Sequence, residues 1–427
     1  MQRRDIFRFA GAASLAGSAG ALSGCAATSK AKGAKVVVVG GGYGGATAAK
    51  YVRMWSDYGI EVTLVEPNPA FVSCPLSNLV VGGTKTLADI TTPYDNLAKR
   101  HGVKVVHDRA VSIDPDKRTV RLAGGSDLPY DRLVLSPGID FMLDALPGMA
   151  AAGAQDQVLH AWKAGPQTVA LRRQLEAMPD GGVYALSIPL APYRCPPGPY
   201  ERACQVAHYF SKAKPRSKVV IFDANDDVTS KGALFKKAWA ERYKGIIEYR
   251  PKHVARDVSA NSGTLRFEFN DDFKADVLNV LPPMRAGAIA VQTGLATANA
   301  RWCEVDFLTF ESKAAKNIHV LGDAIQIAPT MPKSGHMANQ HGKTCAAAIV
   351  ALLSDQAPNP APIYNNVCYS FVSDQDVVHV ASVHSYDAAK QTMLPVAGSG
   401  GVSVAANELE GRYAHAWARN IWADTLA

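Results

Sequence analysis

Uninterrupted apolar runs rich in β-branched residues predict buried strands of a parallel sheet near the start of the chain. Residues 35–39 and 60–65 are two such runs, and residues 46–50 between them favour a helix. The turn before this helix carries three glycines in the spacing Gly-x-Gly-x-x-Gly, namely Gly40, Gly42 and Gly45. Such glycines permit a tight turn and let backbone amides reach a pyrophosphate at the helix N-terminus. The second strand ends at Glu66, placed to accept a hydrogen bond from a ribose hydroxyl, so the segment predicts a dinucleotide site.

Two later segments indicate which dinucleotide is bound. Residues 317–321 predict a strand that ends in Gly322 and Asp323. Residues 132–138 predict a short strand followed by a turn at Gly138. Both resemble the FAD-binding pattern of the glutathione-reductase-like flavoproteins, in which the Gly-Asp carboxylate binds the ribityl chain. The resemblance implies FAD rather than NAD, and it implies a second nucleotide-binding domain between the two halves.

That second domain is recognisable but lacks a phosphate cradle. Residues 182–189 and 217–223 predict its first two strands. An enzyme that uses NAD(P)H needs Gly-x-Gly-x-x-Gly between such strands, whereas residues 190–201 contain four prolines and a cysteine, Cys195. Proline has no backbone N–H to offer a phosphate, and bulky side chains block its close approach. We therefore expect that NAD(P)H is not the reductant.

Composition narrows the function classes. The 427 residues are 48% apolar and 19% charged, which allows large cores and excludes disorder as the main feature. The net charge of +7 comes without a Lys/Arg run interleaved with aromatics, so nucleic acid is not an expected partner. After residue 25 no apolar run reaches the roughly 18 residues of a membrane span. None of the seven cysteines lies in Cys-x-x-Cys-His, the attachment pattern of a c-type haem, and no metal-ligand spacing is convincing.

The N-terminus has the pattern of an export signal. Arg3 and Arg4 precede an apolar pair, Arg8 and a 14-residue apolar stretch, which is typical of twin-arginine export of a folded, cofactor-loaded protein. We therefore expect a periplasmic protein, in a compartment where disulfides persist. The sequence Leu-Ser-Gly-Cys ending at Cys25 leaves two alternatives open, a lipid anchor on this cysteine or cleavage just after it.

Four further sequence motifs indicate one family. They are Phe71-Val-Ser-Cys-Pro-Leu-Ser-Asn78, Cys195-Pro-Pro-Gly-Pro-Tyr-Glu201, Met331-Pro-Lys-Ser-Gly335 and Cys368-Tyr-Ser370. With them the chain resembles, from the export signal to the C-terminus, the flavoprotein subunit of flavocytochrome c sulfide dehydrogenase, a relative of the sulfide:quinone oxidoreductases. The resemblance implies a redox-active disulfide between Cys195 and Cys368 and a thioether from Cys74 to the 8α-carbon of FAD. It also implies a heterodimer with a c-type cytochrome subunit, which would hold the haem that this chain cannot attach.

Two charged residues near these cysteines are candidates for the chemistry. Glu201 lies where the cysteine loop becomes a helix, so desolvation there would let it move protons during sulfur attack. The alternative is a first-turn glutamate that the helix dipole stabilises. Lys333 precedes a helix N-terminus and is placed to stabilise an anionic reduced flavin, the alternative being a solvent lysine. Cys204, Cys303 and Cys345 are interpreted as buried small residues.

The C-terminal tail predicts a helix with Trp417 and Ile421 on one face. The tail is short and contains interspersed Arg and His, so we interpret it as a lid over the flavin side rather than as a helix lying on a membrane. In the family that the chain resembles, an aromatic at the position of Trp417 lies between flavin and haem subunit. A core aromatic is the alternative.

The expected fold is α/β, with two Rossmann-like domains, the FAD domain being discontinuous, and a C-terminal α+β interface domain. The expected segments are a leader at 1–33, the FAD domain at 34–147 and 286–358, the second domain at 148–285 and the interface domain at 359–427. The leading hypothesis is oxidation of sulfide to sulfur or polysulfide, with electrons passing to a c-type cytochrome. The alternatives are a peripheral sulfide:quinone oxidoreductase, a non-catalytic electron-transfer or sulfur-carrier flavoprotein, and an NAD(P)H-dependent disulfide reductase, which the missing cradle disfavours.

Overall fold

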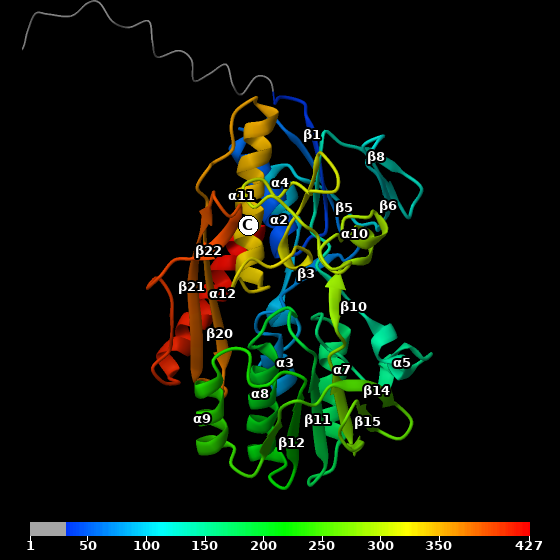
Figure 1. Cartoon of the computed structure of the whole chain (residues 1–427), viewed down its shortest axis with the longest axis vertical. Coiled ribbons are helices and arrows are strands. Elements are labelled where there is room, and N and C mark those ends of the chain that lie inside the picture. Colours follow the sequence, from blue (N-terminus) through cyan, green and yellow to red (C-terminus); the bar gives the residue numbers. More distant parts are fainter. Residues whose placement is uncertain (1–30) are drawn as a thin grey trace, which may run out of the picture.

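The computed structural model describes residues 31–427 of the chain. Its first sheet is parallel, with strand order β19-β9-β1-β2-β5. The strands are β1 (Lys35–Val39), β2 (Glu61–Val65), β5 (Lys104–Val106), β9 (Arg132–Leu135) and β19 (Ile318–Val320). Two long helices, α2 (Tyr43–Trp55) and α11 (Gly335–Leu353), pack against each other beside this sheet (Figure 1). The sheet therefore takes its last strand from a segment about 180 residues further along the chain than its neighbour β9.

The second sheet is also parallel and has strand order β13-β12-β11-β17. Its strands are β11 (Val183–Ile188), β12 (Lys218–Asp223), β13 (Ile247–Arg250) and β17 (Val277–Val280). The helices of this unit are α7 (Pro166–Ala177), α8 (Gly198–Ala213) and α9 (Gly232–Arg242). Figure 1 shows it in green, below the first sheet. The burial of nearly every side chain in β11 and β12 explains their continuous apolar sequence.

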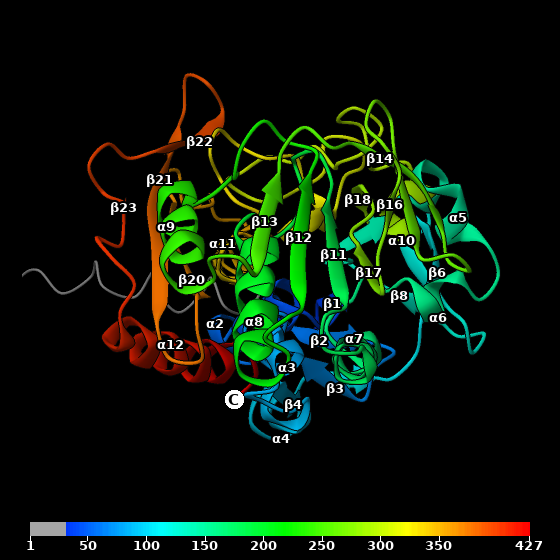
Figure 2. The ribbon, with the colours of Figure 1, turned by 90° about the horizontal axis from the view of Figure 1, so that it is seen from below.

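The C-terminal unit is an antiparallel sheet with one long helix. The strands are β20 (Ile363–Phe371), β21 (Val377–Asp387), β22 (Thr392–Pro395) and β23 (Gly401–Val402), and the helix is α12 (Glu408–Leu426). β20 contacts α11 of the first unit and α8 of the second. Helix α12 contacts β20 and β21 and packs on α2, and Figure 2 shows it in red beside the ends of these strands. This unit therefore bridges the two parallel sheets.

Smaller elements complete the fold. The strand pairs are β3 (Ala70–Val72) with β4 (Thr91–Pro93) and β10 (Ile139–Phe141) with β18 (Met284–Ala286). Two three-stranded sheets contain β6 (Ala110–Asp114), β7 (Thr119–Leu122) and β8 (Asp127–Pro129), and β14 (Ala255–Ser259), β15 (Thr264–Phe267) and β16 (Phe273–Lys274). The short helices are α3 (Ser77–Gly82), α4 (Asp95–His101), α5 (Pro147–Ala150), α6 (Ala154–Gln157) and α10 (Ala288–Gln292), with 3-10 turns η1 (Ala88–Ile90), η2 (Leu143–Ala145) and η3 (Gly322–Ala324).

The predicted α/β fold class is confirmed. The predicted strand at 60–65 starts one residue later, because the Ile60 amide donates to the Ser56 hydroxyl (3.2 Å) instead of joining the sheet. Between residues 31 and 427 no helix combines the length and the hydropathy that crossing a bilayer requires. The domain boundaries stay predictions, and the expected export signal and Cys25 lie outside the described residues.

Candidate functional site

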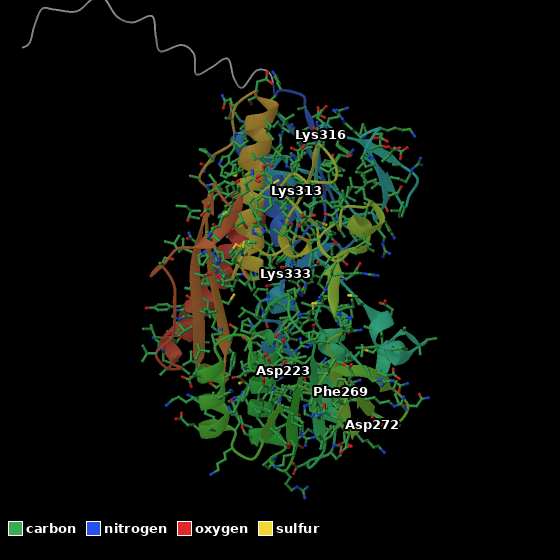
Figure 3. All side chains as sticks on the ribbon, viewed as in Figure 1. Asp223, Phe269, Asp272, Lys313, Lys316 and Lys333 are labelled. Carbon is green, nitrogen blue, oxygen red and sulfur yellow. The ribbon has the colours of Figure 1, made fainter. Side chains whose placement is uncertain are left out.

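A cavity lies where the three units meet, and most of the predicted site residues line it. From the first unit it is lined by residues of the glycine turn, of the loop after β3, and of the segment from η3 to α11. The second unit contributes the loop between β11 and α8, and the C-terminal unit contributes β20 and α12. Predicted site residues in the lining are Gly42, Cys74, Gly138, Cys195, Glu201, Gly322, Asp323, Lys333 and Cys368. Figure 3 shows Lys333 between the upper and lower halves of the molecule.

The glycine turn leaves one open approach to its backbone. A Cβ on Gly40 would lie 2.2 Å from the carbonyl oxygen of Ser136, and one on Gly45 would lie 1.9 Å from that of Gly40. These two glycines are therefore required by the packing of strand, turn and helix. A Cβ on Gly42 would have no atom of the described residues within 4 Å apart from its chain neighbours, and Gly42 lines the cavity. Because a side chain there would fill the space, Gly42 is where a pyrophosphate can approach the N-terminus of α2.

Glu66 stabilises this turn through hydrogen bonds and does not line the cavity. Its Oε2 accepts the amide of Gly41 (2.8 Å), and its Oε1 accepts the amide of Asn68 (2.9 Å). The Tyr94 hydroxyl donates to the Gly41 carbonyl at 3.0 Å and holds the same peptide. A carboxylate has further lone pairs beyond those used here, so a ribose contact of Glu66 remains a prediction.

The carboxylate of Asp323 is a candidate group for binding a ligand. Its Oδ1 is buried and has no hydrogen-bond partner among residues 31–427. The preceding Gly322 has φ +75°, and its amide donates to Nδ1 of His341 at 3.3 Å. A buried acceptor without a hydrogen bond carries a free-energy penalty. A hydroxyl group of a bound molecule that donates to it would remove this penalty. The ribityl chain of FAD supplies such hydroxyls, and this carboxylate therefore fits the cofactor.

Lys333 is buried, so the interpretation as a solvent lysine is wrong. Its side chain lies over the ring of Trp302, with Nζ 3.7 Å from the ring centroid. Nζ donates to the carbonyl oxygens of Asp323 (2.9 Å) and Ile325. Burial lowers the pKa of Lys333 to about 7. Backbone carbonyls therefore hold the side-chain nitrogen of Lys333, and its contact with a reduced flavin stays a prediction.

Cys195 and Cys368 line the same cavity although 173 positions separate them in the sequence. Cys195 lies just before α8 with φ +55°, and its amide donates to the Lys333 carbonyl at 2.7 Å. Cys368 lies on β20, and both residues are free thiols in this structure. Burial raises the pKa of each thiol. The pairing of these two cysteines in a disulfide remains a prediction, and their common cavity is what it requires.

Glu201 is buried beside these cysteines, in the first turn of α8. Its Oε1 accepts the amide of Phe371 (2.9 Å) and its Oε2 accepts the side-chain amide of Asn78 (2.8 Å). Burial raises the pKa of Glu201. The carboxyl group therefore joins α8, α3 and β20 at the cavity wall, and it can hold a proton nearer to neutral pH than an exposed glutamate.

Sequence reasoning missed two buried cations at this site. Lys231 donates from Nζ to the carbonyl oxygen of Cys368 (2.9 Å) and to the Ser370 hydroxyl (2.7 Å). Burial lowers the pKa of Lys231 to about 8. Arg202 is 1% exposed, and its acceptors among residues 31–427 are neutral, for example Asn78 Oδ1 at 3.0 Å. The sequence signal for Arg202 was its position directly after Glu201, at the end of the motif that begins at Cys195. No local sequence feature indicated Lys231.

A third missed cation, Arg194, contacts the predicted flavin-attachment cysteine. Its Nη2 lies 2.7 Å from Sγ of Cys74, and it also donates to the carbonyl oxygen of Trp162. Cys204, Cys303 and Cys345 have no exposed surface, which confirms their interpretation as buried residues.

The aromatic residue of the tail, Trp417, also lines the cavity. Its ring lies 5.8 Å from that of His336 and 6.2 Å from that of Tyr369, measured between centroids. The same three residues line a second, more open groove beside α12. Trp417 therefore separates the cavity from the surface, which agrees with a lid and disfavours a core aromatic.

The second parallel sheet has its nucleotide position filled by tyrosines. Asp223 ends β12, where a ribose-binding acid would lie, and Figure 3 labels it in the lower half. Its Oδ2 accepts the hydroxyls of Tyr200 (2.6 Å) and Tyr249 (3.0 Å). Tyr193, in the loop after β11, is 2% exposed and hydrogen-bonds Thr229 at 2.8 Å. Aromatic side chains and prolines thus occupy the space that a glycine cradle would leave to a nucleotide.

We therefore expect NADH and NADPH to leave the flavin oxidised, while sulfide reduces it. The measurement is the anaerobic absorbance of the flavin after mixing the purified protein with each donor. Sulfide added to the same cuvette after NADH is the control that the flavin can be reduced. Rapid bleaching by NADH at micromolar concentration would contradict this prediction.

Three family models match the chain. Residues 34–177 match the pyridine nucleotide-disulphide oxidoreductase model, residues 168–282 the central part of the sulfide dehydrogenase [flavocytochrome c] flavoprotein chain, and residues 360–426 the flavin-binding part of flavocytochrome c sulphide dehydrogenase. The sulfide dehydrogenase [flavocytochrome c] flavoprotein chain of Chlorobaculum thiosulfatiphilum is 65% identical over 46 residues, which are 94% of that sequence and 11% of this chain.

The chain is also similar to sulfide:quinone oxidoreductases. The mitochondrial sulfide:quinone oxidoreductase of Mus musculus is 27% identical over 331 residues, which cover 72% of this chain and 69% of that one. The structure of the sulfide:quinone oxidoreductase of Aquifex aeolicus superposes with a TM-score of 0.74 at 19% identity, over 92% of this chain and 91% of that one. The latter likeness shows the shared fold.

Fold, cavity and comparisons together define an FAD-dependent flavoprotein oxidoreductase of the pyridine nucleotide-disulphide oxidoreductase class. Within this class the chain belongs to the sulfide-oxidising flavoprotein family of the flavocytochrome c sulfide dehydrogenase flavoprotein chain.

Proposed function

We propose that this chain oxidises hydrosulfide through a disulfide between Cys195 and Cys368 and passes the electrons, by way of FAD, to a c-type cytochrome. The observation that carries the proposal is the meeting of the two cysteines with Glu201 and Asp323 in one cavity. A thiol pair, a carboxyl group with raised pKa and an unpaired acceptor for FAD are the parts that disulfide-mediated sulfur oxidation needs.

FAD would be held by Gly42 at its pyrophosphate and by Asp323 at its ribityl chain. Cys74, between β3 and α3, lines the same cavity and is the proposed attachment point of a thioether to the 8α-carbon. Such a bond withdraws electrons from the ring system, which favours electron uptake from a sulfur donor. Lys333 and the N-terminus of α11 beyond it would add positive charge near the bound cofactor.

The sulfur chemistry proceeds by thiol–disulfide exchange. Hydrosulfide attacks one sulfur of the disulfide, so that the S–S bond breaks and a persulfide forms on one cysteine while the other becomes a thiolate. A second hydrosulfide removes the outer sulfur as HSS⁻, which leaves one thiol and one thiolate. Re-forming the disulfide releases two electrons and one proton, and FAD, when bound, would supply the acceptor for the electron pair. In sum, two HS⁻ give HSS⁻, one proton and two electrons.

Side chains around the cavity suit these anionic species. Lys231, bound to the Cys368 carbonyl, brings a cation next to the cysteine that would carry a thiolate or persulfide. Arg202 adds a guanidinium whose four acceptors are all uncharged. Glu201 is a candidate to take the proton that the cycle releases, because burial raises its pKa and so favours its protonated form.

A c-type cytochrome subunit is the proposed electron acceptor, in a heterodimer. Two of the three matching family models carry the flavocytochrome name, which supports this acceptor over a quinone. Trp417 lines both the cavity and the open groove beside α12, and we propose that electrons would leave past it. We also propose that the chain is exported folded to the periplasm by the twin-arginine route, with Cys25 as a candidate lipid anchor.

The acceptor is tested by purifying the protein from its native source and measuring sulfide-dependent reduction of c-type cytochrome and of a soluble quinone. We expect a haem-containing subunit to co-purify and its haem to be reduced upon addition of sulfide. Reduction of quinone without any bound haem would instead identify a peripheral sulfide:quinone oxidoreductase. A flavin that sulfide does not reduce would identify an electron-transfer or sulfur-carrier flavoprotein.

A further inference from the structure

The guanidinium of Arg194 makes a contact that the sulfide chemistry does not use. Its Nη2 donates to Sγ of Cys74 at 2.7 Å, across 120 positions of sequence. Cys74 lies after β3, and its carbonyl accepts the amide of Ser77 at the start of α3, which fixes the loop. Arg194 lies after β11 and directly precedes Cys195. The contact therefore joins the loop proposed for flavin attachment to the loop of the redox-active cysteine.

Arg194 is held in place from both sides by Trp162. Its Nη2 donates to the Trp162 carbonyl, and its own carbonyl accepts the Trp162 indole N–H at 3.3 Å. Burial opposes the charge of this guanidinium, but the nearby sulfur of Cys74 and carboxylate of Asp323 stabilise it, so the pKa of Arg194 is raised. Its positive charge is partly buried and faces a sulfur atom. A thiolate is the one charged state of that sulfur, and an adjacent arginine stabilises it.

We propose that Arg194 holds Cys74 as a thiolate and so enables the chain itself to attach FAD. This inference rests on the proposed covalent link and names the residue that makes the link form. The step joins Sγ to the 8α-carbon of FAD and breaks one C–H bond of its methyl group. One proton leaves, and two electrons stay on the flavin until haem or dioxygen, as a one-electron or two-electron oxidant, removes them. Arg194 acts on the sulfur, so it is a positioning residue.

Alkylation of the apoprotein tests the thiolate without any flavin. At neutral pH, iodoacetamide should alkylate Cys74 about tenfold faster in the wild type than in the Arg194→Met variant, the scale of a lost charge-assisted hydrogen bond. Peptide mass mapping identifies the alkylated residue. Arg194→Lys keeps the cation and should restore part of the rate. Equal rates of Cys74 alkylation in all three proteins would overturn the inference.

Attachment itself is read as flavin fluorescence that stays with the chain in a denaturing gel. Arg194→Met should bind FAD but attach it at least about tenfold more slowly than the wild type. This is the scale of a lost charge-assisted hydrogen bond. The matched control is Arg301→Met, because Arg301 donates to Pro192 in the same loop and does not touch Cys74. If wild-type protein releases all its flavin on denaturation, the proposed link is wrong. If wild-type and Arg194→Met attach FAD equally fast, the link stands and the inference about Arg194 is wrong.

Discussion

Replacing either Cys195 or Cys368 by serine should reduce the rate of sulfide-dependent flavin reduction by at least about a thousandfold, as expected when one member of a catalytic unit is lost. Serine cannot form a disulfide, so hydrosulfide has no S–S bond to attack. The flavin should stay bound with a nearly unchanged spectrum, because serine is almost the size of cysteine and both residues only line the cavity. The measurement is anaerobic stopped-flow absorbance of each variant after mixing with sulfide.

Cys204→Ser is the matched control for this experiment. Cys204 lies on α8, nine positions after Cys195, but is buried and accepts a hydrogen bond from the Trp239 indole at 3.3 Å. Its replacement should leave the reduction rate within a few-fold of the wild type. If Cys195→Ser or Cys368→Ser behaved like Cys204→Ser, hydrosulfide would have to attack the flavin directly, and the disulfide route would be wrong.

Cys74→Ser should convert all of the flavin from chain-bound to acid-releasable. The serine hydroxyl is not ionised at neutral pH, so it cannot take the place of a thiolate as the nucleophile. FAD should still bind through Gly42 and Asp323, which lie on other loops of the cavity. Precipitation with acid, followed by fluorescence of pellet and supernatant, measures the change.

Cys195→Ser serves as the reciprocal control, because it alters the same cavity without removing the attachment sulfur. Its flavin should stay in the pellet, whereas that of Cys74→Ser should appear in the supernatant. Free FAD in the supernatant of the unmutated protein would contradict the covalent link at once.

The sequence predicted those parts of the site that short segments build. The glycine turn, the Gly-Asp turn and the proline-rich loop each carry their chemistry in a few consecutive residues. The structure places Gly42, Asp323 and Cys195 in one cavity because the strands before them end at neighbouring edges of two parallel sheets. Local patterns of this kind can be recognised without knowledge of tertiary contacts.

The remaining parts depend on contacts between distant segments. Lys231 is one of 45 lysines and arginines, and only the packing of α9 near β20 brings its ammonium to Cys368. Arg194 meets Cys74 through the approach of two loops from different units. The burial of Lys333 was likewise invisible, because the side chain turns back onto Trp302 and the carbonyls after β19. Sequence spacing contains no signal for such convergence.

The sulfur intermediate provides the most direct test of the disulfide mechanism. Purified protein is mixed anaerobically with sulfide, quenched after increasing times with excess alkylating agent, and digested for mass spectrometry. We predict that a peptide containing Cys195 or Cys368 gains one additional sulfur atom before the flavin is fully reduced. A flavin that becomes reduced while both cysteines remain in an unmodified disulfide would contradict it.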